Sequence, residues 1–249
     1  MCYGSDALPR LYFGALIFLA GLTIPPTQVH AEPLMFHASQ SGKQTLDAGE
    51  GGGNPFASAL IEILGRPSGT LADLRDGMKQ LTFEKSRGFQ EADVPAALPD
   101  KTWSLAPIRS GEKRIALVLV VSDYTNSGGA ASLPGARRDA QRIAAAFERA
   151  GFTTSVALDL ALPGLRRTLS AFANQSENSD ASIIYTTGHG IESAGKIYLL
   201  AGNYPVGLQQ TAVATHALPL AEIAGSLRAK QVNLLFYGGC RDNPFSNQR

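Results

Sequence analysis

Four apolar segments alternate with helical patterns in the second half of the chain, and this alternation limits the fold more than any other feature. The expected strands lie at residues 114–122, 152–158, 181–187 and 231–237. The first of them, RIALVLVVS, is apolar at successive positions, which is typical of a strand covered on both faces. Helical patterns separate these strands at residues 139–150, 165–172 and 218–227. The alternation predicts an α/β fold with a parallel sheet flanked by helices.

The residues before position 105 form a first block with clear helix signals. Asn54 and Pro55 are typical of a helix cap and a first helical position, with the helix at residues 56–64. Thr70 and Asp73 match the pattern of a capping box at the start of a second helix. The apolar residues of that helix fall on one side, at Leu71, Leu74, Met78 and Leu81.

The first residues have the pattern of an export signal. Residues 11–24 are uncharged, and this run is short for a bilayer span but suits the core of a signal peptide. Because Val29 and Ala31 are small, we expect residues 1–31 to be a signal peptide cleaved after Ala31, and the protein to be periplasmic or secreted. Arg10 is the one basic residue before the run, so an uncleaved segment that anchors the protein to a membrane is the alternative.

Cleavage of this signal would leave Cys240 as the single cysteine of the mature chain. Oxidising compartments usually pair or exclude thiols, so an unpaired cysteine in an exported protein suggests a reactive thiol with a function. A buried, inert cysteine is the alternative. Its surroundings favour the first interpretation, because Gly238 and Gly239 join Cys240 directly to the end of an expected strand.

His189 follows another expected strand in the same way. The carboxyl ends of parallel strands share one edge of a sheet, where functional groups collect, so a contact between His189 and Cys240 is expected. An imidazole can take the proton of a thiol and leave a thiolate nucleophile. The backbone N–H groups of Gly190 and Cys240 are the expected oxyanion hole. These residues predict a cysteine peptidase with a His189–Cys240 dyad.

Two motifs resemble the caspase and metacaspase superfamily: YTTGHG at residues 185–190 and GGCRDNPF at residues 238–245. His189 precedes Cys240 by the spacing of about 50 residues that caspases show. The resemblance covers residues 114–245 and includes LPGARRDAQRIAAAFERAGF, which starts at Leu133. It implies a three-layer caspase-like fold with a mostly parallel central sheet, and cysteine endopeptidase activity on peptides or proteins.

The first block resembles the small-subunit region of the same superfamily, from Met35 in MFHASQSGKQTLDAGEGGGNPFASALIEIL. It opens with an expected strand at residues 34–39. In most relatives this region follows the catalytic cysteine, but here it comes first, as in type III metacaspases. We therefore expect a circularly permuted domain: residues 32–105 are small-subunit-like, residues 106–113 are a linker, and residues 114–249 are large-subunit-like.

The resemblance also implies a substrate preference. Asp139 matches one acid of the pocket that binds basic side chains in metacaspases, whereas Gly238 stands where relatives carry a second acid. No arginine stands where caspases bind a substrate aspartate. Cleavage after Arg or Lys is therefore expected, with Asp139 as the substrate-binding residue.

Other functions find little support in the sequence. A net charge of +1, without a basic stripe interleaved with aromatic residues, argues against nucleic acid. His37 and His216 lack Cys or His neighbours at metal-ligand spacing, so no metal site and no cofactor are expected. Calcium activates some relatives, but no acidic loop here indicates it. We expect no stable membrane association after signal removal, and the oligomeric state stays open. The alternative function is a caspase-like binding or regulatory module without catalysis.

Overall fold

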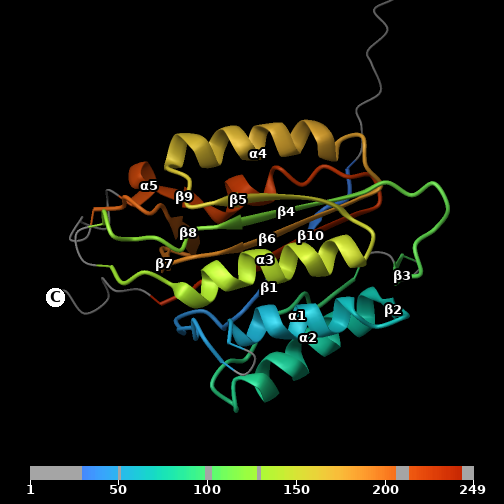
Figure 1. Cartoon of the computed structure of the whole chain (residues 1–249), viewed down its shortest axis with the longest axis horizontal. Helices are drawn as coiled ribbons and strands as arrows, with labels where there is room; N and C mark the ends of the chain where they lie inside the picture. The colour runs from blue at the N-terminus through green and yellow to red at the C-terminus, as the bar shows by residue number, and fades with distance from the viewer. Residues whose placement is uncertain (1–29, 50–51, 99–102, 128–129, 206–212, 243–249) are drawn as a thin grey trace, which may run out of the picture.

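The computed structural model describes residues 30–49, 52–98, 103–127, 130–205 and 213–242. A parallel five-stranded sheet lies at its centre (Figure 1). In spatial order its strands are β1 (Pro33–His37), β10 (Val232–Tyr237), β6 (Ala181–Thr187), β4 (Arg114–Val120) and β5 (Thr153–Leu158). The predicted α/β class with a parallel sheet is confirmed. The four strands predicted in the second half agree with the observed bounds to within two residues.

The edge strand β1 joins the first block to this sheet. It runs parallel to β10, with His37 beside Tyr237 at the end of the paired region. The segment that follows β1 therefore starts next to the segment that follows β10. This register places residues 38–49 close to Cys240, although they lie far apart along the chain.

Helices cover both faces of the sheet (Figure 1). Helix α4 (Leu162–Ser176) and the short α6 (Leu220–Ala224) pack on one face, while α1 (Pro55–Leu64), α2 (Leu71–Lys85) and α3 (Pro134–Arg149) belong to the other. Side chains of β4 alternate between the two apolar cores, because successive strand residues point to opposite faces. Val118 and Val120 enter one core, and Leu117 and Leu119 enter the other.

The predicted helix starts of the first block are confirmed. Asn54 caps α1, since its side chain accepts a hydrogen bond from the N–H of Phe56 at 2.8 Å. Thr70 and Asp73 form the capping box of α2. The predicted apolar side of α2 is buried, at Leu71, Leu74, Met78 and Leu81.

Helix α3 starts at Pro134, earlier than the predicted residue 139. The carboxylate of Asp47 accepts hydrogen bonds from the N–H groups of Gly135 and Ala136, both at 2.8 Å. These bonds satisfy donors that a helix N-terminus leaves free. The partner comes from the other block, so the local pattern around residue 134 gives no sign of it.

The helix predicted at residues 218–227 is wrong in its first part. A small antiparallel sheet forms there from β7 (Gly190–Ser193), β8 (Lys196–Leu200) and β9 (Ala217–Pro219). Leu218 pairs with Leu199 in β8, and α6 begins only at Leu220. Pairing with a distant strand overrides the helical period of this segment. The remaining elements are the short helix α5 (Val213–His216) and the pair β2 (Gly69–Thr70) and β3 (Ser104–Ala106).

The residues between β3 and β4 pack against the domain. The guanidinium of Arg114 pairs with Glu112 at 2.8 Å, with both side chains almost fully buried, and lies 4.9 Å from the ring centre of Trp103. Glu112 also accepts a hydrogen bond from the indole of Trp103 at 2.9 Å. The end of the segment predicted as a linker is therefore fixed by side-chain contacts.

The predicted signal peptide lies almost wholly in residues 1–29, outside the described residues. Among the residues that the structure does describe, no helix has both the length and the apolar character needed to span a membrane.

Candidate active site

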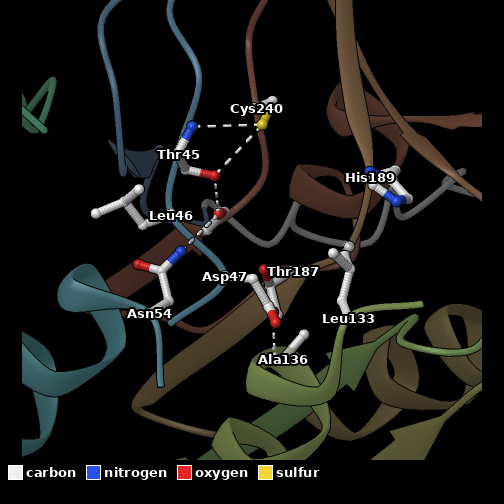
Figure 2. Close-up of a pocket in the computed structure, with 11 residues that line it drawn as sticks. Thr45, Leu46, Asp47, Asn54, Leu133, Ala136, Thr187, His189 and Cys240 are labelled. Atoms are coloured by element: carbon white, nitrogen blue, oxygen red, sulfur yellow. Dashed lines mark hydrogen bonds between the residues drawn. The ribbon is translucent and has the colours of Figure 1, made fainter. Parts of the chain in front are cut away.

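The parallel pairing of β6 with β10 brings His189 and Cys240 to the same end of the sheet. Thr186 lies beside Tyr237 in the register, and each predicted site residue stands three positions further along its chain. Both residues line one small pocket of about 90 Å³ (Figure 2). The other residues that line it are Thr45, Leu46, Asp47, Asn54, Leu133, Ala136, Thr187, Gly188 and Gly238.

Close packing at the end of β10 explains the two glycines before the cysteine. A Cβ atom on Gly239 would lie 2.5 Å from the hydroxyl oxygen of Tyr237. A Cβ atom on Gly238 would lie 2.9 Å from Oγ1 of Thr187 and 3.1 Å from the hydroxyl oxygen of Tyr185. A side chain at position 238 would therefore require the side chain of Thr187 or Tyr185 to shift.

Hydrogen bonds hold the imidazole of His189 in a defined orientation. Its Nε2 atom lies 2.7 Å from the carbonyl oxygen of Ala131. A carbonyl oxygen only accepts, so in the neutral ring Nε2 carries the proton and Nδ1 keeps its lone pair. The backbone N–H of His189 donates to the hydroxyl of Tyr124 at 2.8 Å, and that hydroxyl donates to the carbonyl of Leu200 at 3.0 Å.

Tyr124 also packs edge-on against the His189 ring, with ring centroids 4.5 Å apart. It is buried, and burial raises the pKa of its hydroxyl well above the ordinary value. The hydroxyl therefore stays protonated and keeps both hydrogen bonds. Among the described residues Nδ1 of His189 has no hydrogen-bond partner, so the neutral ring keeps a lone pair available on this atom.

The sulfur of Cys240 is half-buried and lies against Thr45 (Figure 2). It accepts a hydrogen bond from the N–H of Thr45 at 3.4 Å, and Oγ1 of Thr45 lies 3.5 Å from it. Within the described residues the sulfur and the His189 ring make no direct hydrogen bond, and Figure 2 shows them on different sides of the pocket. A substrate carbonyl group in the pocket would thus have the sulfur and the imidazole on different sides.

The backbone N–H groups of Gly190 and Cys240, predicted as an oxyanion hole, are not used in strand pairing, although Gly190 itself is not among the residues that line the pocket. The N–H of Cys240 donates to no acceptor among the described residues. Gly190 lies opposite Leu199 in the antiparallel pairing of β7 and β8. The residues just before this pair, His189 and Leu200, are joined by a hydrogen bond from Leu200 N to His189 O, so Gly190 and Leu199 form a pair without hydrogen bonds between them. In an antiparallel ladder such a pair points its own N–H groups away from the partner strand. Neither group is therefore used by the pairing of these strands.

The structure leaves Asp139 out of the pocket lining. Its side chain is fully buried and bonds the N–H of Asn54 and the guanidinium of Arg142, each at 2.8 Å. Burial is the main cause that raises the pKa of Asp139 to about 6. Asp47, which the sequence analysis did not select, does line the pocket.

Four more residues of the site had no local signal for their role. Thr45 contacts the sulfur, Tyr124 and Ala131 hold the histidine, and the side chain of Asn54 donates to the carbonyl of Gly238 at 3.2 Å. Asn54 was predictable as a helix cap, but its second bond depends on the packing of both blocks. In the described part of the chain, no group of three or more His, Cys, Asp or Glu side chains could hold a metal ion.

A known protein family matches the part of the chain that carries the candidate site. The family model described as the caspase domain matches residues 113–249, which run from β4 to beyond β10 and include both His189 and Cys240. The search of curated proteins gave no match. On the strength of the family match, which covers more than half of its length, the chain belongs to the caspase-domain family of cysteine peptidases.

Proposed function

We propose that the protein is a cysteine endopeptidase that cleaves peptide or protein substrates after Arg or Lys, with His189 and Cys240 as its catalytic dyad. The observation that carries the proposal is the shared pocket at the ends of β6 and β10, where one side chain offers a thiol and the other a free basic nitrogen. The caspase-domain match over these residues supports the same reaction class.

The geometry suggests a stepwise acyl transfer. His189 acts as the general base for the Cys240 thiol, and because the two side chains make no direct hydrogen bond among the described residues, the proton reaches Nδ1 by closer approach or through one water. The sulfur then attacks the substrate carbonyl carbon. The N–H groups of Gly190 and Cys240 stabilise the oxyanion that forms. His189 then protonates the departing amine, and water hydrolyses the thioester with the same imidazole as base. The bond from Nε2 to Ala131 stabilises the imidazolium that exists between these steps.

Two carboxylates support a preference for basic residues. Asp47 lines the pocket, and no ion pair within the described residues includes it. Asp139 lies deeper and is already paired with Arg142. A substrate guanidinium or ammonium would gain a charge-assisted hydrogen bond from Asp47, while Asp139 would act through the negative charge it adds behind Asn54.

The order of the two blocks supports a circular permutation of the domain. The family match begins at residue 113, yet β1 of the first block lies beside β10 in the central sheet. We infer that the first block supplies the small-subunit part of one caspase-like domain. Export through the N-terminal signal is part of the same proposal.

Two single variants and their combination test the dyad. Cys240→Ala and His189→Ala should each abolish cleavage of Arg and Lys peptides, and the double variant should lose no more than either alone, because the two groups act as one unit. Circular dichroism should show that each variant is folded. Full cleavage by a folded Cys240→Ala protein would refute Cys240 as the nucleophile, whereas a folded wild type that cleaves none of these peptides would leave a binding or regulatory module as the function.

A further inference from the structure

Thr45 is a residue outside the proposed dyad that contacts the reacting sulfur. Its N–H donates to Sγ of Cys240 at 3.4 Å, and its Oγ1 atom lies 3.5 Å from the same sulfur (Figure 2). The two residues are 195 positions apart in the sequence. Thr45 reaches the sulfur because β1 lies beside β10, so the first block contributes directly to the surroundings of the thiol.

The hydroxyl of Thr45 has one proton and two acceptors within reach. Besides the sulfur, the carbonyl oxygen of Gly238 lies 3.2 Å from Oγ1 in donor geometry. A threonine hydroxyl carries a single donor, and its O–H bond rotates to suit its surroundings. The proton can therefore serve the carbonyl of Gly238 or the sulfur of Cys240, but not both in full.

The carbonyl of Gly238 keeps a partner when the hydroxyl turns away. Nδ2 of Asn54 donates to the same oxygen at 3.2 Å. Asn54 is buried and held in place, because its Oδ1 atom caps α1 and its own N–H donates to Asp139. Leaving a buried carbonyl without a donor is costly, and this second donor removes that cost.

We propose that the Thr45 hydroxyl is a switchable hydrogen-bond donor that stabilises the thiolate form of Cys240. While the sulfur is a thiol, the hydroxyl donates to Gly238. When the S–H bond breaks, the proton moves to Nδ1 of His189, the electron pair stays on the sulfur, and the hydroxyl rotates towards it. The O–H bond of Thr45 stays intact throughout. The inference rests on the proposed role of Cys240 as nucleophile.

The hydrogen bond from the Thr45 hydroxyl to the sulfur is stronger when the sulfur is a thiolate than when it is a thiol. A neutral thiol is a weak acceptor, so the carbonyl of Gly238 holds the proton better in the resting enzyme. A thiolate carries a full charge, and hydrogen bonds to charged groups are roughly twice as strong as neutral ones. With the fixed N–H of Thr45, the hydroxyl then gives the anion two donors from one residue.

Alkylation of Cys240 by iodoacetamide across a pH series tests the inference, since only the thiolate reacts. The full chain carries Thr45→Val, Thr45→Ala or Thr45→Ser, and peptide mapping separates Cys240 from Cys2. Valine and alanine remove the hydroxyl, and serine keeps it. The pH midpoint of alkylation should rise by about one pH unit in the valine and alanine variants, as expected for one lost hydrogen bond to a charged sulfur. The serine variant should match the wild type.

The remaining ionisable groups near the sulfur are the same in all four proteins. His189 and Asp47 line the same pocket, and the hydroxyl of Tyr237 donates to the carbonyl of Cys240. Arg241 and Asp242 directly follow Cys240 in the chain. A difference in the pH midpoint of alkylation between the Thr45→Val and Thr45→Ser variants is therefore caused by the hydroxyl group itself. Equal midpoints in all variants, or an equal rise in serine and valine, would overturn the inference. If the Thr45→Val variant does not fold, the midpoint of the Thr45→Ala variant is compared with that of Thr45→Ser, because alanine is smaller than threonine.

Peptide cleavage measured on the same proteins separates this inference from the proposed function. A raised midpoint in a protein that cleaves no peptide would keep the role of Thr45 and reject the peptidase. If the wild type cleaves peptides but the alkylation midpoint of the valine variant is unchanged, the peptidase function is kept and the role of Thr45 is rejected.

Discussion

Asp47 and Ala136 connect the two blocks of the chain at the candidate active-site pocket. The carboxylate of Asp47 accepts the N–H of Ala136 at 2.8 Å, and both residues line the pocket beside Cys240. The same carboxylate holds the N-terminus of α3, and Asp47 lines the pocket that we propose receives the substrate. Helix stability and substrate preference are therefore predicted to depend on one residue.

Asp47→Asn tests this double role. Loss of the charge should lower kcat/KM for Arg peptides by about tenfold to a hundredfold, the range expected for a charge-assisted hydrogen bond, and should affect neutral peptides much less. The amide still offers one acceptor oxygen to α3. Cleavage rates on matched Arg and Gln peptides measure the effect, and an equal loss on both would show that Asp47 only supports the fold.

Asp139 should make the folded state sensitive to pH. Burial raises its pKa from 3.8 to about 6, so the folded protein keeps a proton that the unfolded chain has already lost at pH 5. The stabilisation is complete below about pH 4 and is lost as the pH rises through 6. Arg142 and Asp47 are the charged groups that act on Asp139.

Asp139→Asn is the matched variant for this effect. Relative to it, the wild type should lose roughly 3 kcal/mol of unfolding free energy between pH 4 and pH 7, at about 1.4 kcal/mol per pKa unit. Urea unfolding of both proteins at several pH values measures the difference. A constant difference across this range would contradict the assigned ionisation.

Tyr124→Phe should weaken catalysis more than binding. The variant removes the acceptor of the His189 N–H and the donor to Leu200 while keeping the ring contact. Loss of one such bond is worth about 1 kcal/mol, so kcat should fall by roughly fivefold to tenfold with KM little changed. The control is Tyr204→Phe, because the buried hydroxyl of Tyr204 has no partner among the described residues. Equal effects of the two variants would argue against a role in positioning His189.

Gly238→Ala should destabilise the protein even though it adds only one methyl group. The new Cβ atom would lie 2.9 Å from Oγ1 of Thr187 and 3.1 Å from the hydroxyl oxygen of Tyr185. Overpacking of this kind costs about 1–3 kcal/mol, and urea unfolding measures it. Gly195→Ala is a useful comparison, since the added atom meets nothing within 4 Å although its φ of +71° costs some strain. A variant at position 238 as stable as the wild type would show that the glycine is not required by packing.

The central sheet was predictable because its strands carry local signals. Parallel strands such as β4 and β6 are buried on both faces and carry short runs of apolar residues, and Asn54 and Thr70 mark helix starts by residue type alone. The edge position of His189 and Cys240 followed from the general rule for parallel sheets. The small sheet of β7, β8 and β9 was not predictable, since its strands are short and gain their order only by pairing.

The remaining parts of the site depend on contacts between distant residues. Thr45 has no distinctive neighbours in the sequence, and its role emerges only where β1 meets β10. Asp139 matched a family motif, yet the structure buries it against Arg142 and leaves Asp47 in the pocket lining. Sequence motifs thus pointed to the candidate residues His189 and Cys240, whereas the contacts that surround them required the packed structure.

Covalent capture of the nucleophile tests the central claim most directly. The wild type and His189→Ala are incubated with a peptide acyloxymethyl ketone ending in Arg, and the modified residue is located by peptide mass mapping. The proposed dyad predicts one adduct on Cys240 in the wild type, its near absence in His189→Ala, and protection by an Arg peptide substrate. An unmodified Cys240 in the folded wild type, or equal labelling without His189, would contradict the account.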